Sequence, residues 1–164
     1  MSLITVLFIV VFIHSVSCYG QYYDLSNQVN NGSELKSTLL NENEFIVMTV
    51  WFNHLRYNEY QNQRNLMIQS SVKDLIRRCH PYAMYTEADV SGYSESANTF
   101  IDRAKEWRLQ LTDLYDGPIL MVIYDCHGEN FWGTADARPY NLIHTVDQYI
   151  RYLERTYFKN EAPA

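Results

Sequence analysis

The feature that most constrains the fold is an almost unbroken apolar run from Phe45 to Phe52. It is rich in β-branched and aromatic side chains, and Thr49 is the one polar residue within it. A strand of this composition has no polar face to turn towards water, so it must be buried on both sides. We therefore expect a central strand covered by helices on both faces, which places the chain in the α/β class.

The segments on either side of this run predict further helices and strands. An apolar stripe at helical spacing predicts an amphipathic helix over about 59–78, and Pro81 ends it. Its members are Ile68, Val72, Leu75, Ile76 and Cys79. The last helix, over about 141–158, is expected to turn Leu142, Val146, Tyr149, Ile150, Leu153 and Tyr157 inward.

The remaining elements complete a β-α-β-α-β-α-β-β-α order. Ser94 is placed to cap a helix whose inner face is Ala97, Phe100, Ile101, Ala104 and Trp107. Short strands are expected over 22–25, 82–90, 119–124 and 130–134, and a helix over 33–41. The tight connection 125–129 predicts that the last two strands form a β-hairpin.

The first residues are expected to be a targeting segment. Leu3 to Ile13 is an eleven-residue apolar stretch, interrupted only by Thr5, and it is shorter than the roughly 20 residues that a membrane span needs. We predict a signal peptide over 1–18, cleaved after Cys18, and a single domain over 19–164. Lipidation of Cys18 and an uncleaved anchor are the alternatives. After cleavage no stable membrane span is expected, and the protein would be secreted, luminal or periplasmic.

Charge and composition exclude several function classes. The net charge is −6 and basic residues are not clustered, which argues against nucleic acid as a partner.

Two Cys-His pairs, Cys79-His80 and Cys126-His127, could in number supply four zinc ligands. Adjacent side chains point apart, however, so we expect no metal site and no cofactor.

The two cysteines that remain after signal removal have two open interpretations. In an oxidising compartment Cys79 and Cys126 could form a structural disulfide, or they could be two separate thiols. The sequon at Asn31 would be a glycosylation acceptor only in a eukaryotic secretory pathway.

Four landmark residues accompany this element order. Trp51 closes the central strand, Asp89 closes the third, Pro118 opens the fourth and Gly133 ends the fifth. With the element order, they resemble the thioredoxin superfamily over essentially the whole mature chain. The resemblance implies a three-layer α/β/α sandwich with a mixed, mostly five-stranded sheet. It also implies a cis peptide bond before Pro118.

The chain departs from the family at the site of its chemistry. Leu55 and Asn58 stand where the two active-site cysteines would be. Thr49 replaces an acidic residue that many members bury, and Gly117 precedes the proline where Thr, Ile or Val is usual. Disulfide exchange needs a thiolate nucleophile, so dithiol oxidoreductase activity is not expected at this position.

These observations predict a redox-inactive protein that binds a protein or peptide and acts as a chaperone-like or assembly factor. The expected binding groove has no catalytic residue and consists of His54, Leu55, Arg56, Tyr57, Asn58, Gly117 and Pro118. Tyr57, Tyr60 and Tyr115 are expected to flank it, because tyrosines commonly supply contact area. The alternative is a thiol-disulfide oxidoreductase or another enzyme that uses Cys79 or Cys126.

Overall fold

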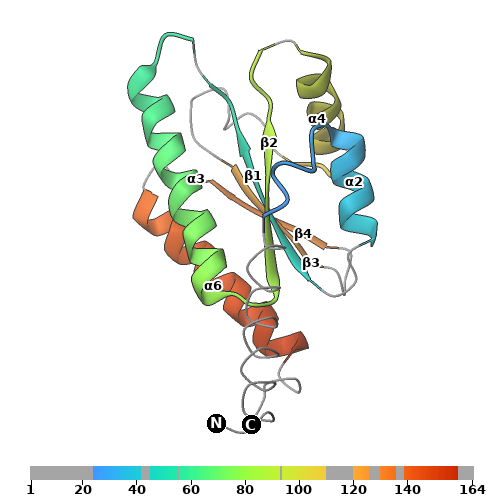
Figure 1. The fold of residues 1–164 in the computed structure, drawn as a ribbon, viewed down its shortest axis with the longest axis vertical. Coiled ribbons are helices and arrows are strands. Elements are labelled where there is room, and N and C mark those ends of the chain that lie inside the picture. Colours follow the sequence, from blue (N-terminus) through green and yellow to red (C-terminus); the bar gives the residue numbers. More distant parts are fainter. Residues whose placement is uncertain are drawn as a thin grey trace, which may run out of the picture.

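The computed structural model describes residues 24–41, 45–54, 56–92, 94–109, 120–125, 130–135 and 139–158. The expected signal peptide, the residues Leu55, Gly117, Pro118 and Cys126, and the expected cis peptide lie outside these ranges. The described elements, in chain order, are α2 (Gly32–Asn41), β1 (Ile46–Phe52), α3 (Glu59–Cys79), β2 (Ala83–Asp89), α4 (Glu95–Glu106), β3 (Leu120–Asp125), β4 (Asn130–Ala135) and α6 (Pro139–Tyr157) (Figure 1).

The strands form one mixed sheet in the order β2-β1-β3-β4. β1 runs parallel to β2 and antiparallel to β3, and β3 and β4 form the predicted antiparallel hairpin. The expected α/β class is confirmed. The structure describes four strands and, beyond β2, a single parallel bridge from Asp24 to Tyr85 at the position of the expected first strand.

β1 is buried along its whole length, as its composition predicts, and its alternate side chains enter two separate cores. Ile46, Met48, Val50 and Phe52 pack with the inner residues of α3 and α6. Val47 and Trp51 pack on the other face, with residues of α2 and α4. Helices therefore cover both faces of the sheet, with α3 and α6 on one side and α2 and α4 on the other (Figure 1).

The helices begin where polar side chains can accept from their unpaired backbone N–H groups. The predicted cap at Ser94 is confirmed, because its Oγ accepts from Ala97 N at 3.0 Å. Asn58 caps α3 by accepting from Gln61 N at 3.1 Å. Asn31 does the same for α2, with its Oδ1 3.0 Å from Glu34 N.

The N-terminal segment is held against β2 by charged and aromatic groups as well as by the bridge. Leu25 N donates to Tyr85 O at 2.7 Å, and Lys73 Nζ pairs with the Asp24 carboxylate and lies 5.5 Å from the Tyr85 ring. Burial raises the pKa of Tyr85, and its hydroxyl donates to Glu87 at 2.6 Å. Burial would also raise the pKa of Asp24, but the bonds from Lys73 and Ser26 outweigh it and lower that pKa.

Two residues expected on inner faces are exposed, and two polar residues that were not expected there are buried. Cys79 is exposed, because the stripe of α3 leaves the core in the last turn. Tyr157 is likewise exposed near the end of α6. Conversely, α3 buries the polar residues Asn65 and Gln69 beside Ile68, and Asn65 accepts from Gln61 at 3.2 Å. Ile68, Val72 and Ile76 are buried as predicted.

The start of α2 lies against the middle of α4 with no space for a side chain. A Cβ on Gly32 would come within 2.2 Å of the Thr99 carbonyl oxygen. Gly32 N donates to Thr99 Oγ1 at 2.9 Å, and Ser96 Oγ donates to the Asn30 carbonyl. The layer formed by α2 and α4 therefore depends on a close backbone approach that only glycine permits.

We predict that Gly32→Ala lowers the free energy of unfolding by about 3 kcal/mol, because the backbone of α4 must move. Gly92→Ala is the matched control. Gly92 has φ +70 but open space around its Cβ position, so only backbone strain of about 1 kcal/mol is expected there. Urea unfolding of both variants measures the difference. Equal losses would contradict the close packing of α2 on α4.

Candidate functional site

The loop between β1 and α3 carries most of the residues that the sequence assigned to a binding groove. His54 follows β1, and its backbone N–H donates to Ser91 Oγ in the loop after β2 at 2.7 Å. Val90 N, just after β2, also donates a hydrogen bond to the carbonyl oxygen of Phe52 at the end of β1, at 3.0 Å. The ends of the two parallel strands are thus joined just beneath this loop.

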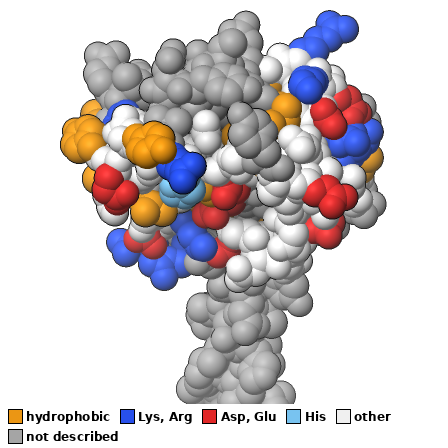
Figure 2. Space-filling model, turned by 90° about the horizontal axis from the view of Figure 1, so that it is seen from above, with side chains coloured by type: hydrophobic (Ala, Val, Ile, Leu, Met, Phe, Trp, Pro, Cys, Tyr) orange, Lys and Arg blue, Asp and Glu red, His pale blue; other side chains and the backbone are white. Residues whose placement is uncertain are grey.

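The aromatic side chains at this end of the molecule point into solvent. Tyr57 is 90% exposed and Tyr60 is 81% exposed, although each carries a large apolar ring. The Arg56 guanidinium lies over the Tyr57 ring, 5.6 Å from its centre. Figure 2 looks down on this end and shows hydrophobic, basic and acidic side chains grouped around a histidine. The cap at Asn58 fixes the point at which the loop becomes the rigid helix α3.

The structure brings part of the predicted groove together. His54, Arg56, Tyr57 and Asn58 share one loop, whereas Leu55, Gly117, Pro118 and Tyr115 fall outside the described residues. The exposed His54 ring meets Phe52 edge-on, with ring centres 5.2 Å apart. This is a packing contact between an exposed ring and the buried end of β1.

The residues beneath the loop belong to the core. Trp51 is fully buried and packs edge-on against Phe100 and Trp107, with ring centres 6.0 and 6.3 Å apart. Thr49, where the resemblance suggested a family acid, is also buried, and it lies opposite Thr86 of β2. The Thr49 and Trp51 side chains belong to the α2/α4 side of the sheet. The side chains in this region that are accessible to a partner therefore begin after Phe52.

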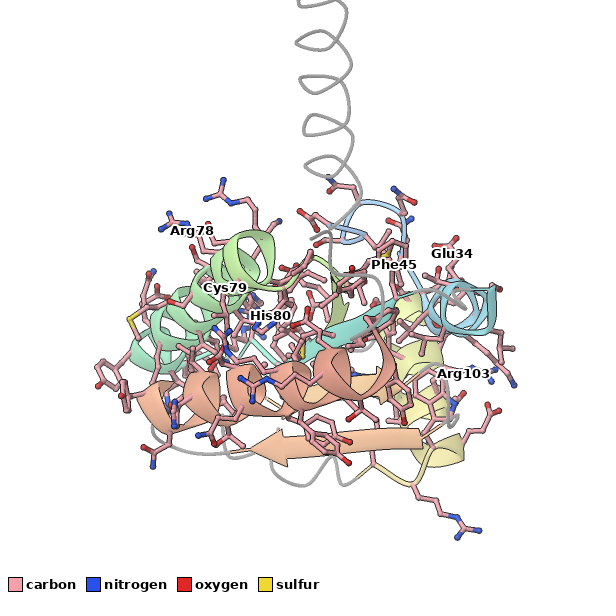
Figure 3. The ribbon with its side chains drawn as sticks, turned by 90° about the horizontal axis from the view of Figure 1, so that it is seen from below. Glu34, Phe45, Arg78, Cys79, His80 and Arg103 are labelled. Atoms are coloured by element: carbon pink, nitrogen blue, oxygen red, sulfur yellow. The ribbon has the colours of Figure 1, made fainter. Side chains whose placement is uncertain are left out.

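A second polar cluster, which the sequence did not reveal, lies at the other end of α3. The His80 side chain is completely buried, and each ring nitrogen lies 3.0 Å from a carboxylate of α6, Nδ1 from Glu154 and Nε2 from Asp147. Both bonds form together only when both nitrogens carry a proton, because carboxylates accept hydrogen bonds. His80 thereby joins the α3–β2 connection to α6 (Figure 3).

Asp147, one of the two carboxylates bound to His80, also has a charged neighbour on its own helix. Arg151 Nε donates to both oxygens of Asp147, at 3.0 and 3.1 Å. Burial would raise the pKa of Asp147, but the bonds and charge of Arg151, with the bond from His80, lower it. The cluster pairs charges on one helix with a histidine from another, which is the arrangement of a structural link.

The cysteines give no second site. Cys79 is exposed at the end of α3, and Cys126 lies outside the described residues, so their pairing stays a prediction. The expected glycosylation acceptor Asn31 uses its Oδ1 to cap α2.

Among the residues that the structure describes, no group of three His, Cys, Asp or Glu side chains could hold a metal ion. Within the same ranges, no helix has both the length and the apolar character of a membrane span.

Comparisons with known proteins identify no relative: no family model, no curated protein and no solved structure matches this chain.

We predict that His80→Gln lowers the free energy of unfolding by about 2–3 kcal/mol, because the single amide nitrogen of Gln cannot replace two ring nitrogens that face two partly buried carboxylates. His144→Gln is the control, since His144 is exposed on α6, the helix that carries Asp147 and Glu154, and stacks only on Tyr140 among the described rings. That change is expected to stay within about 0.5 kcal/mol. Chemical unfolding measures both, and equal effects would contradict a structural role for His80.

Proposed function

We propose that this chain is a redox-inactive, thioredoxin-like protein that works by binding polypeptide. The sheet order, the parallel pair β1–β2 and the antiparallel hairpin support the three-layer sandwich that the resemblance implies. The Asp24 bridge beyond β2 supports a fifth strand position at that edge. The apolar run at the N-terminus supports export, so the proposed site of action is extracytoplasmic.

The chemistry of the β1–α3 loop argues against thiol exchange at this position. Residues 53–58 contain no cysteine. The described thiol, Cys79, is at the far end of the 21-residue helix α3 from this loop. At 1.5 Å per residue that helix is about 30 Å long, so Cys79 cannot serve a substrate held at the loop.

The observation that carries the proposal is the exposure of Tyr57 and Tyr60 on a well-anchored loop and helix start. Exposed tyrosines lose little conformational freedom on binding and bring a large apolar ring with a polar tip. Arg56 adds a donor beside them. An extended polypeptide offers both apolar side chains and backbone acceptors to such a surface, which suits a chaperone-like or assembly role.

Binding of a permanently unfolded protein tests this function. Labelled α-lactalbumin, reduced and carbamidomethylated, is titrated with the purified protein and followed by fluorescence anisotropy. We expect the Tyr57→Ala/Tyr60→Ala variant to bind about tenfold more weakly, because tyrosines are common binding hot spots. Leu40→Ala removes an exposed apolar residue from α2 and is expected to leave the affinity unchanged.

Two results would contradict the proposal. One is equal affinity of the tyrosine variant and the wild type. The other is reduction of insulin by the purified protein that Cys79→Ser abolishes, which would favour the thiol enzyme instead.

A further inference from the structure

The exposed apolar residues of the molecule are concentrated on one helical layer. In the described ranges, eight large hydrophobic side chains are exposed, and Leu40 is the one that belongs to the α2/α4 layer. The other seven lie on α3, on α6 or just before α3: Tyr57, Tyr60, Leu66, Met67, Tyr140, Tyr152 and Tyr157. Because α3 and α6 cover the same face of the sheet, these residues share one side of the molecule.

The two helical layers also differ in the sign of their exposed charge. The exposed charged residues of α3 and α6 are four arginines and two acids: Arg77, Arg78, Arg151, Arg155, Glu59 and Asp74. Those of α2 and α4 are four acids and one lysine: Glu34, Glu95, Asp102, Glu106 and Lys105. In a chain of net charge −6, the α3/α6 layer is thus locally basic.

The His80 link gathers these arginines at one end of the layer. It holds the end of α3, which carries Arg77 and Arg78, next to the part of α6 that carries Arg151 and Arg155. Figure 3 shows Arg78 on the outer side of α3 and His80 between the two helices. The Arg78 side chain is 68% exposed.

Neighbouring acids orient three of the arginines without using all their donors. Arg77 Nη2 bonds Asp74 at 2.8 Å, and Arg78 Nη2 lies 3.6 Å from the same carboxylate. Arg151 bonds Asp147 through Nε. A guanidinium has five N–H donors in a fixed fork, so further donors remain for a carboxylate ligand. Side chains that are already oriented lose less conformational freedom when they bind.

From this arrangement we propose that the outer face of α3 and α6 docks an acidic polypeptide. The proposal rests on the function proposed above and specifies the chemistry of the partner. Tyrosine, methionine and arginine are the residues enriched in protein interfaces, and arginine matches carboxylates bidentately. Tyr60 and Arg78 are eighteen residues apart on α3, about 27 Å at 1.5 Å per residue, which an extended segment of about eight residues spans.

Charge and side-chain type also distinguish an acidic polypeptide from the two other partners that such a face could bind, a second copy of this chain and a lipid surface. A second copy of the chain would bring arginines against arginines in a two-fold contact, which like charges disfavour. A lipid surface is bound most often through Lys and Arg with Trp, Phe or Leu. Here the exposed basic side chains of both helices are arginines and most of the exposed rings are tyrosines. An acidic polypeptide fits both sets of residues.

Three labelled 16-residue peptides test the proposal. They share the same apolar positions and carry Glu, Gln or Lys at all the others. We expect the wild type to bind the Glu peptide at least tenfold more tightly than the Gln peptide and the Lys peptide least, with the preference weakening as salt is added. Arg78→Glu/Arg155→Glu should lose the preference. Lys105→Glu/Arg108→Glu makes the same charge change at exposed positions at and just after the end of α4 and should keep it.

The outcomes distinguish this inference from the proposed function. Equal binding of the three peptides, or equal loss in both double variants, would overturn the acidic partner while leaving binding of unfolded α-lactalbumin through Tyr57 and Tyr60 intact. Binding to phosphatidylserine vesicles in place of the Glu peptide would show a lipid surface instead. Self-association that Arg78→Glu/Arg155→Glu abolishes, without Glu-peptide binding, would show a second copy. Either result would overturn the proposal.

Discussion

The structure depends on one strand that is buried on both faces. β1 sends Ile46, Met48, Val50 and Phe52 into the α3/α6 core and Val47 and Trp51 into the α2/α4 core, so neither helical layer can pack without it. It also pairs with strands on both edges, parallel with β2 and antiparallel with β3. A charged residue at any of these positions would disturb the core that its side chain enters. That constraint explains why the run from Phe45 to Phe52 is the most informative feature of the sequence.

Within the two helical layers the helices are joined by different contacts, and this difference bears on function. α2 and α4 approach through Gly32 with backbone contact, and the exposed charged residues of these helices are mainly acidic. α3 and α6 are linked through the buried His80 ring, and they expose tyrosines and arginines. The proposed binding role concerns the second layer alone. The frame therefore provides a rigid support for one chemically distinct surface, and the β1–α3 loop lies at one end of that surface.

The sequence predicts the elements well and the polar contacts poorly. Periodicity and caps predicted the helices and strands, because a double-sided apolar run, a stripe of apolar residues and Ser94 are local signals. The contacts of His80 could not be predicted, since Asp147 and Glu154 lie about seventy residues further along the chain. The burial of Asn65 and the exposure of Tyr157 likewise depend on which neighbouring element covers each position. For the candidate site, the loop residues were predicted, but the extension of the surface along α3 and α6 depends on tertiary packing.

Hydroxyl-radical footprinting tests the central claim, that this frame binds polypeptide on its α3 side, because tyrosine and methionine side chains are both exposed there and reactive. The protein is oxidised alone and in the presence of saturating reduced, carbamidomethylated α-lactalbumin, and modified residues are quantified by mass spectrometry. The account predicts that oxidation of Tyr57, Tyr60 and Met67 falls on binding, whereas that of Leu40 on the opposite layer does not change. Unchanged oxidation of those three residues, or protection of Leu40 in their place, would contradict it.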